Sequence, residues 1–188
     1  MYKPGSQGTV RIIGGEWRSR KLPVADVPGL RPTTDRIRET LFNWLQHSIV
    51  QASCLDLFAG TGALGFEAAS RGAVEVVMIE RDREAFNSLQ QSVEILKTEK
   101  VKVSQADALN WLEKADQSFD IIFLDPPFDQ NLVHETLEQL MRSSCVKKGT
   151  LIYLEEKKQS TEQSLPENLE IIKQGKAGQV RHTLLELS

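Results

Sequence analysis

Short apolar runs alternate with amphipathic stretches through most of the chain from residue 53 onward. The apolar runs predict strands at Cys54–Phe58, Val74–Glu80, Val101–Gln105, Phe119–Asp125 and Thr150–Glu155. The stretches between them predict helices over residues 63–72, 83–97, 108–115 and 131–143. This alternation is typical of an α/β fold, in which a parallel sheet with right-handed crossovers carries helices on both faces. Two later runs predict an antiparallel hairpin at the sheet edge, Leu169–Lys176 and Gln179–Leu187.

The N-terminal part of the chain follows a different pattern. Two apolar runs flank Gly14-Gly15, which is a signal for a hairpin with a two-residue turn. The predicted strands are Thr9–Ile13 and Glu16–Leu22. In an extended strand Arg18 and Arg20 share one face, with a spacing that can follow a phosphate backbone. Trp17 would either stack on a base or pin the hairpin to the body, and we favour the second role.

A connector and a helix follow this hairpin. Pro23–Pro32 contains three prolines and predicts an irregular segment. Thr33 or Thr34 is a good N-cap for the next helix. The apolar stripe of that helix is Ile37, Leu41, Trp44 and Leu45. We therefore predict a basic hairpin and connector over residues 1–32 and a catalytic domain over residues 33–188.

Length and composition describe an ordinary globular protein of 188 residues, with 40% hydrophobic and 26% charged residues. No apolar run approaches the roughly 18 residues that span a bilayer, and the N-terminus lacks the apolar core of a signal peptide. Cys54 and Cys145 lack a metal-like spacing and predict reduced, packed thiols. We expect a cytoplasmic monomer without a membrane segment or a metal site.

The charge is unevenly distributed along the chain. Residues 1–40 contain eight basic and four acidic residues, a balance of +4, so a net charge of −3 leaves −7 for the remainder. A basic end on an acidic body predicts that a polyanion docks at one place. The alternative is a solvated basic arm that has no partner.

The strongest motif follows the strand at Cys54–Phe58. Gly60, Gly62 and Gly65 satisfy the pattern GxGxxG, and Glu80 lies 20 residues after the first glycine, where a ribose-binding acid is expected. Glycine allows a sharp turn and a close approach of ligand to the main chain. The motif predicts a strand-loop-helix site of the Rossmann type. Alone, it fits a nicotinamide dinucleotide as well as S-adenosylmethionine.

Asp56 favours S-adenosylmethionine because it puts a negative charge beside the glycine-rich turn. A dinucleotide would bring its pyrophosphate to the same place, and like charges repel in a partly desolvated site. S-adenosylmethionine carries an ammonium and a sulfonium instead, and both are attracted to a carboxylate.

Acidic residues lie at or just after the carboxyl ends of four successive predicted strands, where ligands bind in open α/β sheets. They are Asp56, Glu80, Asp107 and Asp125. Glu80 is suited to accept hydrogen bonds from both ribose hydroxyls. Asp107 could accept from an adenine amine while Ala108 donates its backbone N–H to a ring nitrogen.

The second strong motif is Asp125-Pro126-Pro127-Phe128. Its prolines fix φ and make the turn stiff, so that its carbonyls have defined directions. Asp125 and the Pro126 carbonyl can accept the two hydrogens of a planar amine while Phe128 stacks on its ring. Such a grip localises the nitrogen lone pair and aims it at a methyl group. We expect Asp125, Pro126 and Phe128 to be the catalytic residues.

These residues do not determine which substrate carries the amine. A clamp for planar amines serves an RNA guanine, a DNA adenine or cytosine, or a glutamine side chain of a protein. Two alternatives are not methyltransferases. One is a nicotinamide oxidoreductase, and the other is a Rossmann-like module that binds a nucleotide without chemistry.

The two motifs resemble class I methyltransferases that alkylate planar amines. A closer resemblance covers almost the whole chain: Arg11–Leu22, Gly29–Leu45 and Ala177–Val180 are similar to the bacterial small-subunit ribosomal RNA guanine-N2 methyltransferase family. The resemblance implies a seven-stranded fold, S-adenosylmethionine as donor, and one guanine of small-subunit RNA as target, with assembled particles preferred over naked RNA. The guanine would be flipped out or unpaired.

The resemblance also implies that Thr34 and Arg36–Arg38 lie near the donor pocket or the RNA entrance. The residues expected to bind the donor are Thr34, Asp56, Phe58, Gly60, Gly62, Glu80, Arg81, Asp107 and Ala108. The residues expected to contact RNA are Arg11, Arg18, Arg20, Lys21, Arg36 and Arg38.

Overall fold

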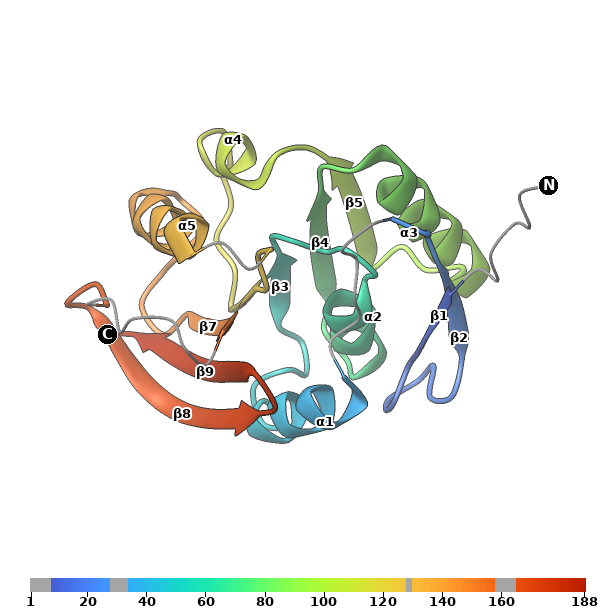
Figure 1. Cartoon of the computed structure of the whole chain (residues 1–188), viewed down its shortest axis with the longest axis horizontal. Helices are drawn as coiled ribbons and strands as arrows, with labels where there is room; N and C mark the ends of the chain where they lie inside the picture. The colour runs from blue at the N-terminus through green and yellow to red at the C-terminus, as the bar shows by residue number, and fades with distance from the viewer. Residues whose placement is uncertain (1–7, 28–33, 128–129, 158–164) are drawn as a thin grey trace.

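The computed structural model describes residues 8–27, 34–127, 130–157 and 165–188. Within them the chain forms a seven-stranded sheet in the order β5-β4-β3-β6-β7-β9-β8 and a separate pair, β1-β2 (Figure 1). The strands are β1 Gly8–Arg11, β2 Lys21–Val24, β3 Ser53–Asp56, β4 Glu75–Glu80, β5 Val101–Gln105, β6 Ile121–Leu124, β7 Leu151–Lys157, β8 Leu169–Ala177 and β9 Val180–Leu187. The helices are α1 Asp35–Trp44, α2 Ala63–Ser70, α3 Arg83–Leu96, α4 Ala108–Leu112 and α5 Gln130–Arg142.

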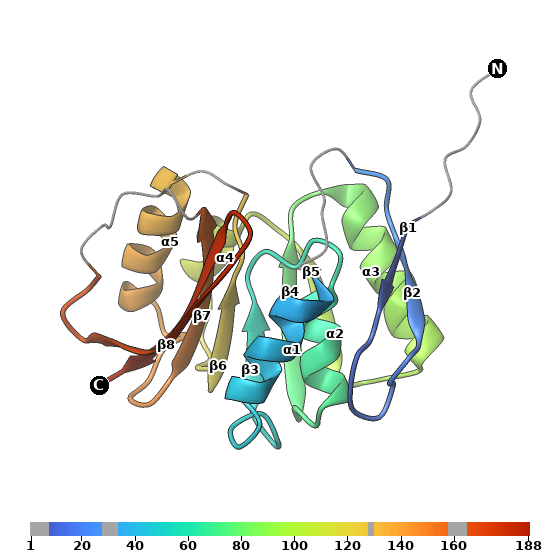
Figure 2. The same cartoon turned by 60° about the horizontal axis from the view of Figure 1, so that its bottom comes forward.

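Strands β3 to β7 pair in parallel, whereas β9 pairs antiparallel with both β7 and β8. Each face of the sheet is covered by helices (Figures 1 and 2). The parallel alternation and the C-terminal edge hairpin predicted from the sequence are thus confirmed, with the ends of elements differing by a few residues. The seven-stranded sheet implied by the resemblance is confirmed as well.

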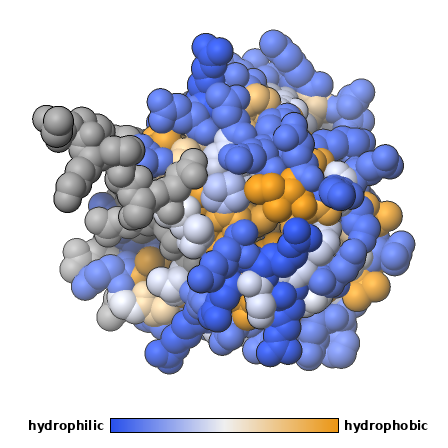
Figure 3. All heavy atoms as spheres, turned by 90° about the vertical axis from the view of Figure 1, so that its right-hand side faces the viewer, coloured by the Kyte–Doolittle hydropathy of each residue, from blue (hydrophilic) through white to orange (hydrophobic). Residues whose placement is uncertain are grey.

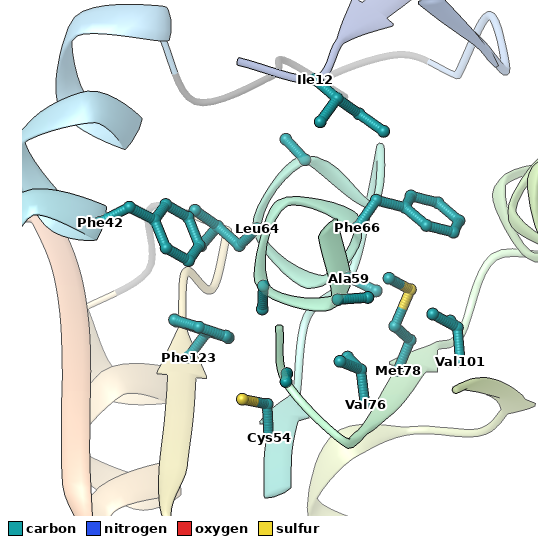
Figure 4. Packing of buried hydrophobic residues seen from close by; sticks show 14 of the residues in the cluster. Ile12, Phe42, Cys54, Ala59, Leu64, Phe66, Val76, Met78, Val101 and Phe123 are labelled. Atoms are coloured by element: carbon teal, nitrogen blue, oxygen red, sulfur yellow. The ribbon is translucent and has the colours of Figure 1, made fainter. Parts of the chain in front are cut away.

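Two apolar cores lie on opposite faces of the sheet, since successive strand side chains point to opposite sides. The first core packs α1, α2 and α3 against the sheet; Figure 4 shows Phe42 of α1, Phe66 of α2 and Phe123 of β6 within it. The second core packs α4 and α5 through side chains such as Leu112 and Leu140. Helix α1 begins after Thr34, whose hydroxyl oxygen accepts a hydrogen bond from the Ile37 N–H at 3.4 Å.

The prediction that a two-residue turn joins the strands of the N-terminal hairpin is wrong. Strand β1 pairs with β2, and residues 12–20 connect them, so Gly14-Gly15 is not a two-residue turn between strands. Gly15 has a φ of +78°, and a Cβ there would lie 1.9 Å from the Ser70 carbonyl oxygen. The Glu16 N–H donates to that same oxygen at 2.7 Å. The glycines therefore permit close contact with the end of α2.

The predicted strand at Glu16–Leu22 is also wrong, because residues 16–19 form a turn. Arg18 and Arg20 consequently do not share the face of one extended strand. Trp17 is 5% exposed, donates its backbone N–H to the Ser70 hydroxyl at 2.9 Å, and joins the first core. Of its two predicted roles, the structural one is confirmed.

None of the helices in the described ranges combines the length and the apolar character that crossing a membrane requires.

Removing the Trp17 side chain should test its packing role. We expect Trp17→Ala to lower the free energy of unfolding by about 3–5 kcal/mol, because a large buried aromatic leaves a cavity. Urea unfolding measures this loss. The neighbouring variant Arg18→Ala, at an exposed position, should stay within about 0.5 kcal/mol of the wild type. A loss below about 1 kcal/mol for Trp17→Ala would contradict its assignment to the core.

Candidate functional site

Three of the four predicted acidic residues lie together at the carboxyl ends of three neighbouring strands. Strands β4, β3 and β6 are neighbours, and their carboxyl ends carry Glu80, Asp56 and Asp125. The negative charges of Asp125 and Glu80 both act on Asp56 and help to raise its pKa. The parallel register explains this meeting, since Asp56 pairs with Phe123 and Asp125 follows two residues later.

A glycine-rich turn over residues 58–62, here called the glycine loop, lies beside these acids. Gly60 and Gly62 have φ values of +51° and +75°, which favour glycine. A Cβ on Gly62 would come within 2.6 Å of Phe66 and Leu89. Helix α2 follows directly, so its first residues and the loop share one rigid unit.

Glu80 holds the glycine loop in place. One carboxylate oxygen accepts the Gly60 N–H at 2.8 Å, and the other accepts the Asp82 N–H at 2.7 Å. Each carboxylate oxygen has a second acceptor site, so these bonds leave acceptor capacity for hydroxyl groups of a ligand. Asp82 in turn caps α3, because its Oδ1 accepts the N–H groups of Glu84 and Ala85 at 2.9 Å. The end of β4 is therefore tied to both neighbouring segments.

Asp56 is the most deeply placed of these acids, with 1% of its side chain exposed. Its Oδ2 accepts the Gly65 N–H at 3.1 Å, whereas its Oδ1 has no hydrogen bond of ordinary geometry. Burial raises the pKa of Asp56 to about 7 and Asp125 adds to the rise, whereas the backbone N–H groups of Gly65 and Phe58 oppose it. A buried carboxyl group in this state attracts a positively charged ligand, which would restore its ionised form.

Asp107 does not join this group. It lies beyond the outermost strand β5, is exposed, and caps α4 by accepting the Leu109 and Asn110 N–H groups at 3.1 and 3.2 Å. Ala108 follows as the first residue of α4 and is buried. Both follow the carboxyl end of β5, which is the parallel neighbour of β4 on the side away from Asp56 and Asp125.

The predicted clamp follows β6. Asp125 is half-buried, Pro126 is buried and Pro127 is exposed. Phe128 lies outside the described residues. The aromatic part of the clamp therefore stays a prediction.

The remaining residues predicted for the donor have varied surroundings. Phe58, in the glycine loop, is half-buried and packs against the second core. Arg81 is exposed just after β4. Thr34 is exposed and acts as the N-cap of α1.

Most of the arginines and lysines predicted for RNA lie on the surface. Those that are exposed are Arg11, Arg18, Arg20, Lys21 and Arg36. The first four belong to the N-terminal hairpin, which lies beside α3 (Figures 1 and 2). Figure 3 looks at the molecule from the hairpin side and shows mostly hydrophilic side chains around a central apolar area. Arg11 is partly neutralised by Asp35, at 2.8 Å, and Arg20 donates to the Ile95 carbonyl at 3.2 Å.

The prediction that Arg38 is available for RNA is wrong in this structure, because its side chain is 1% exposed. Its Nη1 donates to the Arg11 carbonyl at 2.9 Å, and its Nη2 contacts Asp35 Oδ1 at 2.6 Å. Glu67, 3.6 Å away on α2, provides a further negative charge. Arg11 and Glu67 are both more than twenty residues from Arg38 in the sequence, so helical spacing alone did not reveal the burial.

Sequence reasoning missed Glu67, whose side chain is fully buried on α2 and accepts the backbone N–H groups of Ile13 and Gly14. A signal was present, since Glu67 is the one charged residue in the mostly apolar helix Ala63–Ser70.

The family model described as Conserved hypothetical protein 95 matches residues 10–186. The chain is 44% identical to Ribosomal RNA small subunit methyltransferase D of Escherichia coli strain K12, over 99% of this chain and 95% of the relative. The protein of the same name from Haemophilus influenzae is 43% identical, over 99% of this chain and 98% of the relative.

Solved structures agree with the fold. The structure of yhhF, a provisionally assigned methyltransferase from Escherichia coli, has a TM-score of 0.90 and 44% identity, with 96% of this chain and 98% of that chain covered. SMU.776, a provisionally assigned methyltransferase complexed with SAH, has a TM-score of 0.72, covers 99% of this chain and 57% of that chain, and is 13% identical. At that identity the second likeness shows the fold alone.

The raised pKa of Asp56 has a consequence for stability without ligand. The folded pKa of about 7 lies above the ordinary value of 3.8, so this group makes the protein less stable as pH rises from about 4 to 7. Asp56→Asn removes that penalty. We expect its melting temperature to exceed that of the wild type at pH 8 and to differ less at pH 4.5, measured by calorimetry without ligand.

Asp107→Asn is the matched control, since it changes an exposed acid at a neighbouring strand end. Its effect on the melting temperature should be similar at both pH values. An Asp56→Asn protein that melts below the wild type at pH 8 would contradict the assigned pKa.

Proposed function

Since the chain belongs to the family described as Conserved hypothetical protein 95, together with the ribosomal RNA small subunit methyltransferase D proteins, we propose that it methylates the exocyclic N2 amine of one guanine in small-subunit ribosomal RNA. S-adenosylmethionine is the methyl donor. The substrate is the assembled or partly assembled small subunit, and the chain acts as a monomer in the cytoplasm. Residues 1–32 contact RNA and residues 33–188 carry out catalysis.

One observation carries the proposal: the buried carboxyl of Asp56, whose Oδ1 has no hydrogen bond of ordinary geometry, beside the glycine loop and two further acids. These residues fit S-adenosylmethionine, because its positive charge would relieve the clustered negative charge. A dinucleotide would add its pyrophosphate to the same cluster. The glycine-loop pattern is common to both ligands, and the acidic cluster distinguishes them.

The donor would be held by groups that already have defined directions. Glu80, fixed by the Gly60 and Asp82 N–H groups, accepts from the ribose hydroxyls. Asp107 and the Ala108 N–H bind the adenine edge, and Phe58 contributes an apolar contact. S-adenosylmethionine supplies a methyl group bound to a positively charged sulfur. As the bond between this carbon and the target nitrogen forms, the carbon–sulfur bond breaks and the sulfur becomes a neutral thioether.

Asp125 and the Pro126 carbonyl receive the two hydrogens of the target amine. Both acceptors favour a nitrogen lone pair that points out of the base plane, and Asp125 stabilises the positive charge that develops on that nitrogen. Asp125 also accepts the proton that the methylated amine releases. Phe128 stacks on the guanine.

The exposed cations of the hairpin and Arg36 bind the RNA backbone. Asp125 is half-buried next to the fully buried Asp56, so a guanine that stays stacked between neighbouring bases cannot place its amine against it. The base is therefore flipped out or already unpaired, at a cost of a few kcal/mol that stacking offsets.

Two measurements test the proposed function directly. Calorimetry should show binding of S-adenosylhomocysteine and no response to NAD or NADP. Mass spectrometry of small-subunit RNA, from particles lacking the modification and incubated with the protein and donor, should show one new N2-methylguanine. Binding of NAD instead, or methylation of adenine, would refute the proposal.

Replacing Asp125 tests the amine clamp. Asp125→Ala should lower kcat by at least about a hundredfold, because it removes an acceptor that acts in the transition state. Donor affinity, measured by calorimetry, should change little. Near-normal turnover would contradict the clamp, and a parallel loss of donor affinity would point to a structural role instead.

Replacing two hairpin arginines tests the RNA surface. Arg18→Ala combined with Arg20→Ala should raise KM for the small subunit and flatten its dependence on salt, because fewer counterions are released on binding. Donor affinity should be unchanged. Glu16→Gln, which changes an exposed charge of the same loop, should leave KM at or below the wild-type value. An unchanged KM and salt dependence in the arginine variant would contradict RNA contact by this surface.

A further inference from the structure

Glu67 connects three segments of the chain from a fully buried position in α2. Its Oε2 accepts the Ile13 N–H at 2.8 Å, and its Oε1 accepts the Gly14 N–H at 2.8 Å and Arg71 Nε at 2.7 Å. Arg38 of α1 lies 3.6 Å away. A single carboxylate thus contacts the hairpin loop, helix α1 and its own helix.

Arg38 extends the connection back to the hairpin. Its guanidinium donates to the Arg11 carbonyl and pairs with Asp35, whose other oxygen pairs with the Arg11 side chain at 2.8 Å. Arg11 is therefore held through both its backbone and its side chain. The hairpin and the start of α1 are oriented by the same charged cluster, which is centred on Glu67.

A second set of contacts joins the hairpin loop to the end of α2. The Ser70 hydroxyl donates to the Gly14 carbonyl at 2.6 Å and accepts the Trp17 N–H at 2.9 Å. The Ser70 carbonyl accepts the Glu16 N–H at 2.7 Å. Because a Cβ on Gly15 would overlap this carbonyl, the approach is as close as the backbone allows.

The position of α2 gives these contacts a functional meaning. This helix begins at the glycine loop, and at 1.5 Å per residue Glu67 lies about 6 Å and Ser70 about 10 Å along it from Ala63. The same helix therefore links the predicted donor loop to the basic hairpin. A buried ion pair adds little net stability compared with apolar packing, so we attribute the charge at Glu67 to the placement of the segments that it contacts.

We propose that Glu67 is a positioning residue, which sets the RNA-contacting hairpin at a fixed distance and angle from the donor loop. This inference rests on the proposed function. Its consequence is specific: loss of the Glu67 charge should impair the presentation of RNA to the donor, while donor binding itself persists. Donor binding depends on Asp56 and Glu80, whose bonds to the glycine loop and to Gly65 do not involve Glu67. Misplacement of the reacting groups by about 1 Å can lower a rate by up to a hundredfold.

Glu67→Gln is the principal test. Glutamine keeps the shape, but its NH2 group replaces one of the two oxygens that accept Ile13 and Gly14. We expect kcat/KM for the small subunit to fall at least about tenfold and the Kd for S-adenosylhomocysteine to change less than twofold. Hydrogen exchange at the Ile13 and Gly14 amides should become faster. A combined loss of donor affinity, or an unchanged kcat/KM, would overturn the inference.

Thr150→Val controls for a general loss of stability. Thr150 is fully buried and makes two hydrogen bonds, to the Phe119 carbonyl and from the Lys147 N–H, neither of which involves the hairpin. At a temperature well below both melting points, this variant should retain wild-type kcat/KM. An equal fall in both variants would attribute the effect to stability and refute a positioning role.

A double-mutant cycle tests whether Glu67 acts by positioning the hairpin arginines. If Glu67→Gln displaces the hairpin, the added change Arg18→Ala with Arg20→Ala should cost less in kcat/KM than it costs in the wild type. Fully additive losses would refute the inference. Gly15→Ala is an independent variant should Glu67→Gln fail to fold, because its Cβ pushes the loop from Ser70 without removing a buried charge.

The two proposals fail in different ways. If the wild-type protein itself does not methylate the small subunit, the proposed function is refuted, and the positioning role with it. If the wild type is active and Glu67→Gln is equally active, only the positioning role is refuted.

Discussion

The buried carboxyl of Asp56 is the constraint on which the site depends. Its Oδ1 has no hydrogen bond of ordinary geometry and its pKa is raised to about 7, so the fold without ligand carries an electrostatic cost at neutral pH. Two apolar cores, one on each face of the sheet, supply the stability that tolerates this cost. The strand order then brings Glu80 and Asp125 to the same edge. The acidic edge is thus a consequence of topology, and its positive counterpart must come from a ligand.

The central sheet was predictable because the alternation of strand and helix patterns has few physical solutions. The N-terminal hairpin was not, since the same glycine pair serves a tight turn or a close tertiary contact. Gly15 meets Ser70, a residue more than fifty positions away, and local sequence does not contain that information. The exposure predicted for Arg38 was wrong for the same reason, because the Arg11 carbonyl and Glu67, which lie beside its guanidinium, come from distant parts of the sequence.

The candidate site was predictable to the extent that strand ends determine it. Asp56, Glu80 and the glycines lie together, as expected for residues that follow parallel neighbours. The individual role of Asp107 is less direct, because it caps α4 beyond the edge strand of the sheet. Chemistry at the strand ends follows from topology, but the assignment of each side chain to a ligand atom does not.

The hairpin shares the first apolar core with the sheet, through Val10, Trp17 and Leu22. The hairpin proposed to contact RNA and the body proposed to carry out catalysis are therefore not separable pieces of structure. Transplanting this arm onto another α/β enzyme would require the recipient helix to supply equivalents of Glu67 and Ser70. Changes in target choice among related chains should accordingly arise by exchanging surface side chains along the hairpin, with its attachment to α2 left intact.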